Sequence, residues 1–141
     1  MVQAARISIT GTQTMEDSGP QTLELVTDGS YCYEPGFALL SYVESEMTGL
    51  EGVVTSFRIE DGQTVTLRRS GKVNAEMVFD RRQAHDSLYD VGFGAMMISV
   101  VTEDMTVLLN EHGGVLDLDY RVEVEHTLCS RNRYHIEIQT I

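Results

Sequence analysis

Residues 116–125 read Leu-Asp-Leu-Asp-Tyr-Arg-Val-Glu-Val-Glu, and every second position in this stretch is apolar. Side chains of a strand point alternately to the two faces of a sheet, so the pattern predicts a half-buried antiparallel strand with one face in water. Residues 134–139 alternate in the same way, and Cys129-Ser130-Arg131-Asn132 supplies turn-forming residues before them. We therefore predict a long C-terminal hairpin that turns at Cys129–Asn132.

The same alternation recurs upstream, at residues 7–10, 56–59, 64–67 and 72–79. Turn-forming pairs separate these segments: Gly19-Pro20, Asp28-Gly29, Pro35-Gly36, Asp61-Gly62, Ser70-Gly71 and Gly113-Gly114. Turn signals about every ten residues are typical of a β-sandwich or a β-barrel. No long window has the period of a helix, although residues 81–87 have room for one helical turn.

The numbering of the apolar residues predicts the register of one hairpin. Phe57, Ile59, Val65 and Leu67 are all odd-numbered, so they share a face if Phe57 pairs with Leu67. A three-residue loop, Glu60-Asp61-Gly62, with Gly62 in the left-handed conformation, is the connection we predict.

Sequential strands with short connections and no internal repeat indicate an antiparallel up-and-down meander. An open sheet of about ten strands would leave two edges unpaired, whereas closure removes both. We predict an all-β protein, a single domain over residues 1–141, closed into a barrel of about 8–10 strands. A β-sandwich is the alternative.

The composition excludes several classes of protein. Among 141 residues, 22 Asp plus Glu stand against 10 Lys plus Arg, which gives a net charge of −12, and 42% of residues are hydrophobic. The apolar fraction is too high for a disordered acidic chain, and the acidic excess repels a phosphate backbone, so we expect no nucleic-acid partner. Without a secretory signal or a membrane-spanning apolar stretch, we expect a cytoplasmic protein with no membrane partner. Cys32 and Cys129 are too few and too distant for a disulfide framework or a zinc site.

Residues 39–57, LLSYVESEMTGLEGVVTSF, differ from the rest because Gly49 and Gly52 break the alternation. With Tyr33-Glu34-Pro35-Gly36 before it, this block resembles the signature of the YwiB-like family of bacterial proteins, which carry a domain of unknown function. The resemblance extends over nearly the whole chain, through Gly11-Thr12-Gln13, Arg69-Ser70-Gly71, Met77-Val78-Phe79, Ser87-Leu88-Tyr89, Phe93-Gly94, Gly113-Gly114, Leu116, Leu118, Asn132 and Ile136. It implies a lipocalin-like, or calycin-like, β-barrel, and it implies no activity.

The same block holds three acidic residues, Glu44, Glu46 and Glu51, close to Tyr42 and Thr48. Three carboxylates near a barrel mouth are able to bind a cation or an amine, or to serve as acid and base. The alternative is that Glu44 and Glu46 point to solvent and that a turn forms at Thr48.

Arg69 has the odd parity of Val65 and Leu67, which predicts that it points into the barrel near the rim. An inward arginine there binds a carboxylate or a phosphate, pairs with a buried glutamate, or lies in the Ser70-Gly71 turn if the register shifts. The other basic residues nearby are predicted to be solvated: Arg68, Lys72, Arg81 and Arg82.

Motifs for metal binding and catalysis are missing from the sequence. The four histidines, His85, His112, His126 and His135, have no metal-binding spacing, and parity places the last two on opposite faces of the final hairpin. There is no nucleophile elbow and no P-loop. We therefore assign no catalytic residue, no metal and no cofactor.

Barrels of this size are able to enclose one small ligand, so we predict a non-catalytic small-molecule-binding protein. Its predicted polar contacts, at the barrel mouth, are Tyr42, Glu44, Glu46, Thr48, Arg69 and Tyr89. One alternative is an interaction module with a filled barrel, whose acidic outer face meets a protein partner through Asp117, Asp119, Glu123 and Glu125. Another is an enzyme that uses Glu44 or Glu46 with Arg69. No oligomeric state follows from the sequence.

Overall fold

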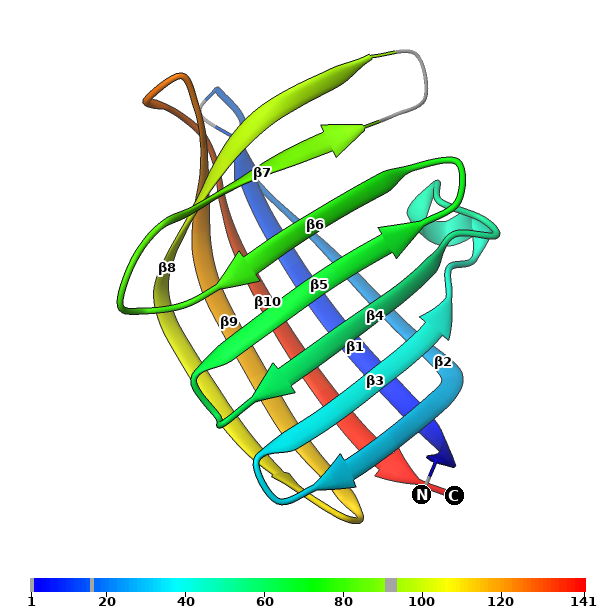
Figure 1. The fold of residues 1–141 in the computed structure, drawn as a ribbon. Coiled ribbons are helices and arrows are strands. Elements are labelled where there is room, and N and C mark those ends of the chain that lie inside the picture. Colours follow the sequence, from blue (N-terminus) through cyan, green and yellow to red (C-terminus); the bar gives the residue numbers. More distant parts are fainter. Residues whose placement is uncertain (1, 16, 91–93) are drawn as a thin grey trace.

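The computed structural model describes residues 2–15, 17–90 and 94–141. Its strands are β1 (Val2–Met15), β2 (Pro20–Glu34), β3 (Phe37–Val43), β4 (Val54–Glu60), β5 (Thr64–Ser70), β6 (Asn74–Phe79), β7 (His85–Asp90), β8 (Ala95–Asn110), β9 (Gly113–Val124) and β10 (Thr127–Thr140). Each pairs with its neighbours in sequence, and β1 pairs with β10 to close an antiparallel barrel (Figure 1). The predicted all-β, lipocalin-like up-and-down barrel is confirmed, and the described residues form ten strands.

The up-and-down order gives the barrel two different ends. The lower end in Figure 1 holds the β2–β3, β4–β5 and β8–β9 hairpins and both termini. The upper end holds the β3–β4, β5–β6 and β9–β10 connections. Between β3 and β4 the chain forms a single 3₁₀ turn, η1 (Glu46–Thr48). The helical turn considered for residues 81–87 does not form, because β7 already begins at His85.

Large apolar side chains fill much of the barrel interior. The fully buried ones include Tyr31, Phe57, Phe79 and Leu116, and their positions follow the alternation of the sequence. The rings of Phe79 and Tyr120 meet edge to face with centroids 4.6 Å apart. This packing supplies the core that a chain of this length needs.

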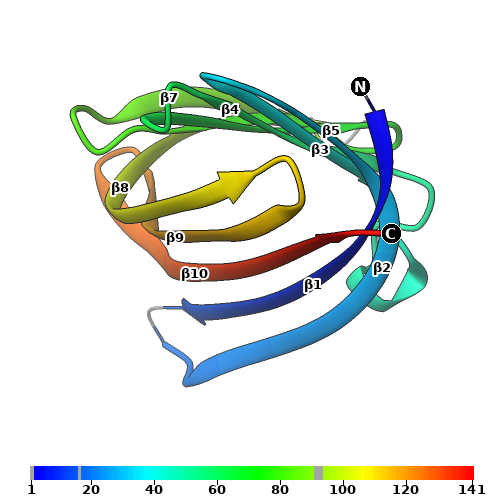
Figure 2. The same ribbon diagram turned by 90° about the horizontal axis from the view of Figure 1, so that it is seen from below.

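The β8–β9 hairpin lies across the lower end of the barrel, as the view from below shows (Figure 2). Tyr31 Oη donates to the carbonyl oxygen of Asn110 over 2.7 Å, which ties the hairpin tip to β2. Gly114 permits the close approach of β9 to β8, because an added Cβ would lie 1.9 Å from the carbonyl oxygen of Leu108. The chain itself therefore covers this end.

The predicted register of the β4–β5 hairpin is confirmed, since Phe57 pairs with Leu67, and Gly62 is left-handed with a φ of 64°. The predicted loop was wrong by one residue. The last pair is Glu60 with Thr64, so the loop is residues 61–63, because this register is centred on Gly62.

The turn predicted at Cys129–Asn132 was wrong, because these residues belong to β10. The strands β9 and β10 turn instead at Glu125 and His126, which have φ values of 52° and 65°. Two left-handed residues match the twist of a tight hairpin. A β-bulge between Leu128 and Ser130 then shifts the register. His126 therefore lies in a turn. Its parity had predicted a position on a strand face, and this prediction was wrong.

Candidate functional site

The irregular block after β3 forms part of the upper end of the barrel. Ser45 caps η1 through its side chain, and Gly49 ends the turn in the left-handed conformation with a φ of 77°. The Glu44 amide donates to Val53 O over 2.8 Å, and the Gly52 amide donates to Glu44 O over 3.1 Å. These bonds hold the backbone of Glu44 at the rim, and its side chain is only 5% exposed.

A cavity of about 370 Å³ lies between this block and strands β1, β2, β5 and β10. Its volume falls in the range of small-ligand sites, about 300–1,000 Å³. One wall is apolar and consists of Ile9, Leu23, Leu25, Leu50 and Phe57. The polar side chains that line it are Thr12, Gln13, Gln21, Thr22, Tyr42, Glu44, Thr48, Arg69, Asn132 and Tyr134. The cavity therefore offers both an apolar surface and polar groups that would orient a ligand.

Arg69 belongs to a row of directly paired residues that crosses five strands. From β3 to β7 the row is Tyr42, Thr55, Arg69, Ala75 and Tyr89. Arg69 lies two residues after buried Leu67 on β5, so it was predicted to point to the same, inward face. Its place in the cavity lining agrees with this prediction. The inward face of β5 thus brings a positive charge to the polar side of the cavity.

Arg69 and Glu44 are the only basic and acidic side chains in the described lining of the cavity. In the described part of the chain no ion pair joins them, although they influence each other electrostatically. Burial lowers the pKa of Arg69, but Tyr134 and Glu44 outweigh it and hold this pKa above its usual value. Arg69 therefore stays charged.

Burial, reinforced by the charge of Glu44, raises the pKa of Tyr42 far above its usual value. Burial also raises the pKa of Tyr120, which lies behind the cavity with its ring centroid 6.1 Å from that of Tyr134. At neutral pH the Tyr42 hydroxyl keeps its proton, and as a donor it interacts with the Glu44 carboxylate.

Two buried side-chain polar atoms have no hydrogen-bond partner in the described part of the chain, Arg69 Nε and Thr55 Oγ1. The two residues are direct cross-strand partners on β5 and β4. A buried polar atom without a partner costs about 1–3 kcal/mol. Arg69 lines the cavity, whereas Thr55 is fully buried behind it and outside the lining, so it is Arg69 that marks a place where a bound molecule would supply a missing partner.

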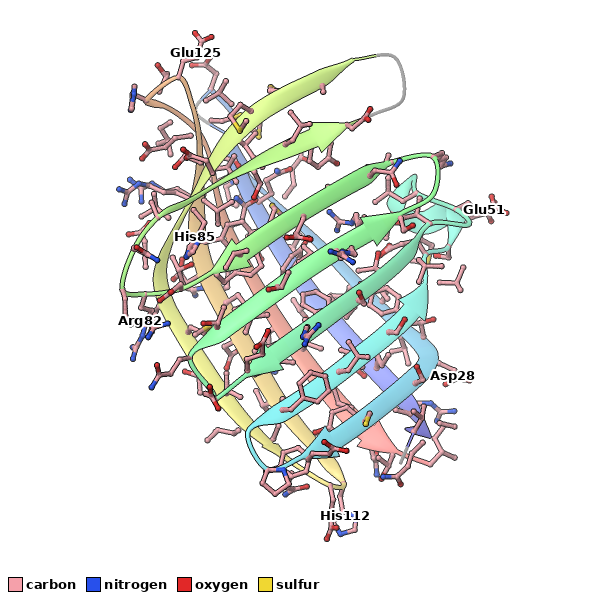
Figure 3. The ribbon with its side chains drawn as sticks, in the orientation of Figure 1. Asp28, Glu51, Arg82, His85, His112 and Glu125 are labelled. Carbon is pink, nitrogen blue, oxygen red and sulfur yellow. The ribbon has the colours of Figure 1, made fainter. Side chains whose placement is uncertain are left out.

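Of the six predicted contacts, the structure brings four to the cavity: Tyr42, Glu44, Thr48 and Arg69. Thr48 Oγ1 donates to Glu44 Oε2 over 3.1 Å. Glu46 lies exposed in η1 and does not line the cavity, and Glu51 projects away from the barrel (Figure 3). Tyr89 lies on β7, two strands from Arg69, with Ala75 of β6 between them. It does not line the cavity, but it helps to raise the pKa of Arg69.

Sequence reasoning missed the contributions of β1, β2 and β10. Tyr134 and Asn132 come from β10. The alternation of residues 134–139 included Tyr134 but did not mark it as a site residue, and the misplaced turn hid the inward position of Asn132. Gly11 makes room for Tyr134, since an added Cβ would lie 2.8 Å from Tyr134 Cε1. A glycine that follows the alternating Ile7 and Ile9 is the signal that could have placed this strand at a site.

A second charged cluster, at the β6–β7 connection, has a structural role. Asp80 is 4% exposed and accepts hydrogen bonds from the amide and Nε of Arg82, both at 2.9 Å. His85 lies beside it (Figure 3). These bonds hold the pKa of Asp80 far below its usual value. Asp80 N also donates to Thr102 Oγ1, which joins β6 to β8 where β6 and β7 form only two residue pairs.

Among the described residues, no group of three or more His, Cys, Asp and Glu side chains is arranged to hold a metal ion. Of the basic residues predicted to be solvated, Arg68 is exposed and pairs with Glu76. No helix in the described ranges has the length and apolar character needed to cross a membrane.

A closed ten-stranded antiparallel barrel with a polar cavity at one end defines a lipocalin-like barrel protein. Residues 7–136 match the family described as domain of unknown function (DUF1934), and the chain belongs to that family. The fold is similar to that of the ywiB protein from Bacillus subtilis, known from a crystal structure. The TM-score is 0.85 and the sequence identity 21%, over 99% of this chain and 93% of that one. No curated protein matches the chain.

The family resemblance carried by residues 39–57 is therefore confirmed. Of the residues on which it rested, Phe93 lies outside the described residues.

Proposed function

We propose that this protein binds a small molecule in the cavity at the upper end of the barrel. The observation that carries the proposal is the unpartnered Arg69 Nε, a donor of a charged side chain, in the lining of a cavity of about 370 Å³. A buried charged group is normally satisfied by a partner.

The shape of the interior supports the same function. A barrel filled with side chains throughout would leave no space for a ligand, whereas the upper end of this barrel holds a cavity of about 370 Å³. The β8–β9 hairpin covers the other end, so a ligand is expected to enter beside η1. The apolar wall would hold the body of the ligand, and the polar groups would set its orientation.

The geometry bears differently on the two alternative functions. Of the two glutamates that the enzyme alternative pairs with Arg69, Glu46 is exposed in η1, whereas Glu44 lines the same cavity as Arg69. On the acidic outer face, Asp119 pairs with Arg133 at 3.0 Å and Glu123 with Arg121 at 2.7 Å. These pairs reduce the negative charge that the face would offer to a basic partner.

Native mass spectrometry of protein purified without refolding tests the proposal. We expect a reproducible retained mass on the wild type. Leu25→Trp would fill the cavity and abolish this mass, whereas Leu39→Trp, on the exposed face of β3, would leave it unchanged. A bare chain for the wild type, or equal retention by Leu25→Trp, would overturn the proposal.

A further inference from the structure

The charges of the cavity carry information about what it binds. One positive and one negative side chain, Arg69 and Glu44, line the same small space, and they form no ion pair with each other in the described part of the chain. Opposite charges in a shared buried site normally gain by direct pairing. Held apart, they form a site whose electrostatic complement is a molecule that carries both charges.

We propose that the ligand is a small zwitterion whose carboxylate binds Arg69 and whose ammonium group binds Glu44. This inference rests on the proposed function, because it concerns the same cavity. It accounts for the unpartnered donor of Arg69, to whose guanidinium the carboxylate would supply an acceptor. The ammonium group would add a charged donor to Glu44, which already accepts from Thr48 Oγ1 and is 5% exposed.

The anionic group is a carboxylate rather than a phosphate because of the charge balance. Arg69 is the one cation among the described lining residues, and Glu44 acts on it through the same space. A phosphate with about two negative charges would be undercompensated by one guanidinium and repelled by the glutamate. A carboxylate carries one charge and matches the planar fork of arginine.

The surroundings of the two charges fit the same ligand. Glu44 is positioned by the hydrogen bond from Thr48 and by the backbone bonds of its own amide and carbonyl. Tyr134 interacts with the Arg69 guanidinium from the β10 side. The lining also includes Leu23, Leu25 and Ile9, which offer apolar surface to an aliphatic side chain. The class of ligand is therefore an apolar amino acid or a molecule with the same two head groups.

Three probes that share an isobutyl group separate the contributions of the two charged head groups to the affinity. Leucine carries both head groups, 4-methylpentanoate carries the carboxylate alone, and 3-methylbutylamine carries the ammonium group alone. Isothermal titration calorimetry with the intact ligand-free protein compares their affinities. We expect leucine to bind about tenfold or more tightly than either single-headed analogue, since each lost charge-assisted bond weakens affinity by about that factor.

Two substitutions assign the head groups to their partners. Arg69→Gln should remove the preference for leucine over 3-methylbutylamine, and Glu44→Gln should remove the preference for leucine over 4-methylpentanoate. The matched controls are Arg68→Gln, whose guanidinium lies on the outside in a pair with Glu76, and Glu46→Gln in exposed η1. Both controls should keep both preferences. Ratios of affinities are the readout, so a general loss of structure, which circular dichroism would detect, does not mimic the result. If Arg69→Gln does not fold, Arg69→Met, which is also uncharged, replaces it.

The inference is overturned if 4-methylpentanoate binds as tightly as leucine, if none of the three probes binds, or if Glu44→Gln leaves the preference unchanged. None of these results would overturn ligand binding itself. That broader function fails only if the wild-type chain is bare in native mass spectrometry or if filling the cavity has no effect on the retained mass.

Discussion

Replacing Thr55 by valine should stabilise the ligand-free protein. Thr55 is fully buried, and its Oγ1 has no hydrogen-bond partner. Valine has nearly the same shape and the same branched Cβ, so the packing and the strand preference are kept while the unpartnered hydroxyl is removed. Removing such a group recovers about 1–3 kcal/mol, which raises the melting temperature by about 3 °C for each kcal/mol in a chain of this length.

Thr102→Val is the matched control with the opposite expected sign. Thr102 is also buried, at 7% exposure, but its Oγ1 accepts a hydrogen bond from the Asp80 amide over 3.1 Å. Valine there would leave a buried N–H without a partner, which costs about 1–3 kcal/mol. Urea denaturation followed by circular dichroism measures both free energies of unfolding, and the m-values should not change.

The reasoning is refuted if Thr55→Val destabilises the protein as much as Thr102→Val does. That result would mean that the Thr55 hydroxyl has a partner in solution. The stabilisation by Thr55→Val should also shrink once ligand is bound, if the ligand hydrogen-bonds to this hydroxyl.

Gly114→Ala should lower the free energy of unfolding by about 3 kcal/mol or more, or prevent folding, because the new Cβ would lie 1.9 Å from the carbonyl oxygen of Leu108. Gly94→Ala, with open space around its Cβ, should leave the stability unchanged, and urea denaturation compares the two variants. Asp80→Asn should destabilise the protein at neutral pH, and its difference from the wild type should shrink as the pH falls below about 4, since the folded-state pKa of Asp80 lies below that of the unfolded chain; urea denaturation at several pH values measures this difference. Hydrogen bonds to two carboxylates raise the pKa of His135, so NMR titration should place it above 6.5, and its contribution to stability should be present below about pH 6.5 and fade as the pH rises through the raised value.

The alternation of the sequence was sufficient to predict the barrel and much of its core. Phe57 and Leu67 face each other as their parity requires, because a shift of one residue would move every apolar side chain on β5 to the outside. The same parity placed Arg69 inward. Local patterns succeed here because an inward or outward position depends only on residue spacing.

The sequence could not place the features that depend on a break in that spacing. The bulge between Leu128 and Ser130 shifts the register of β10, and without it the turn at Glu125 and His126 could not be found. Asn132 keeps the phase of Tyr134 beyond the bulge and was missed because it was assigned to a turn. Glu44 was left open between solvent and interior, because its burial is set by bonds to Val53 and Gly52 beyond η1. The cavity depends on pairing between strands that are far apart in sequence.

The cost in stability of the unpartnered buried atoms argues for a ligand independently of its identity. Two unpartnered buried polar atoms together cost several kcal/mol, at about 1–3 each, against a total stability of about 5–15 kcal/mol for a typical domain. Thr55→Val would remove one of these two unpartnered atoms, so a sequence of the same fold without this cost is only one substitution away. A ligand at about one hundred times its Kd stabilises a protein by about 2.7 kcal/mol, which is of the same size. The cost is therefore small enough to be offset by binding, and the ligand-free barrel should be the least stable form of the protein.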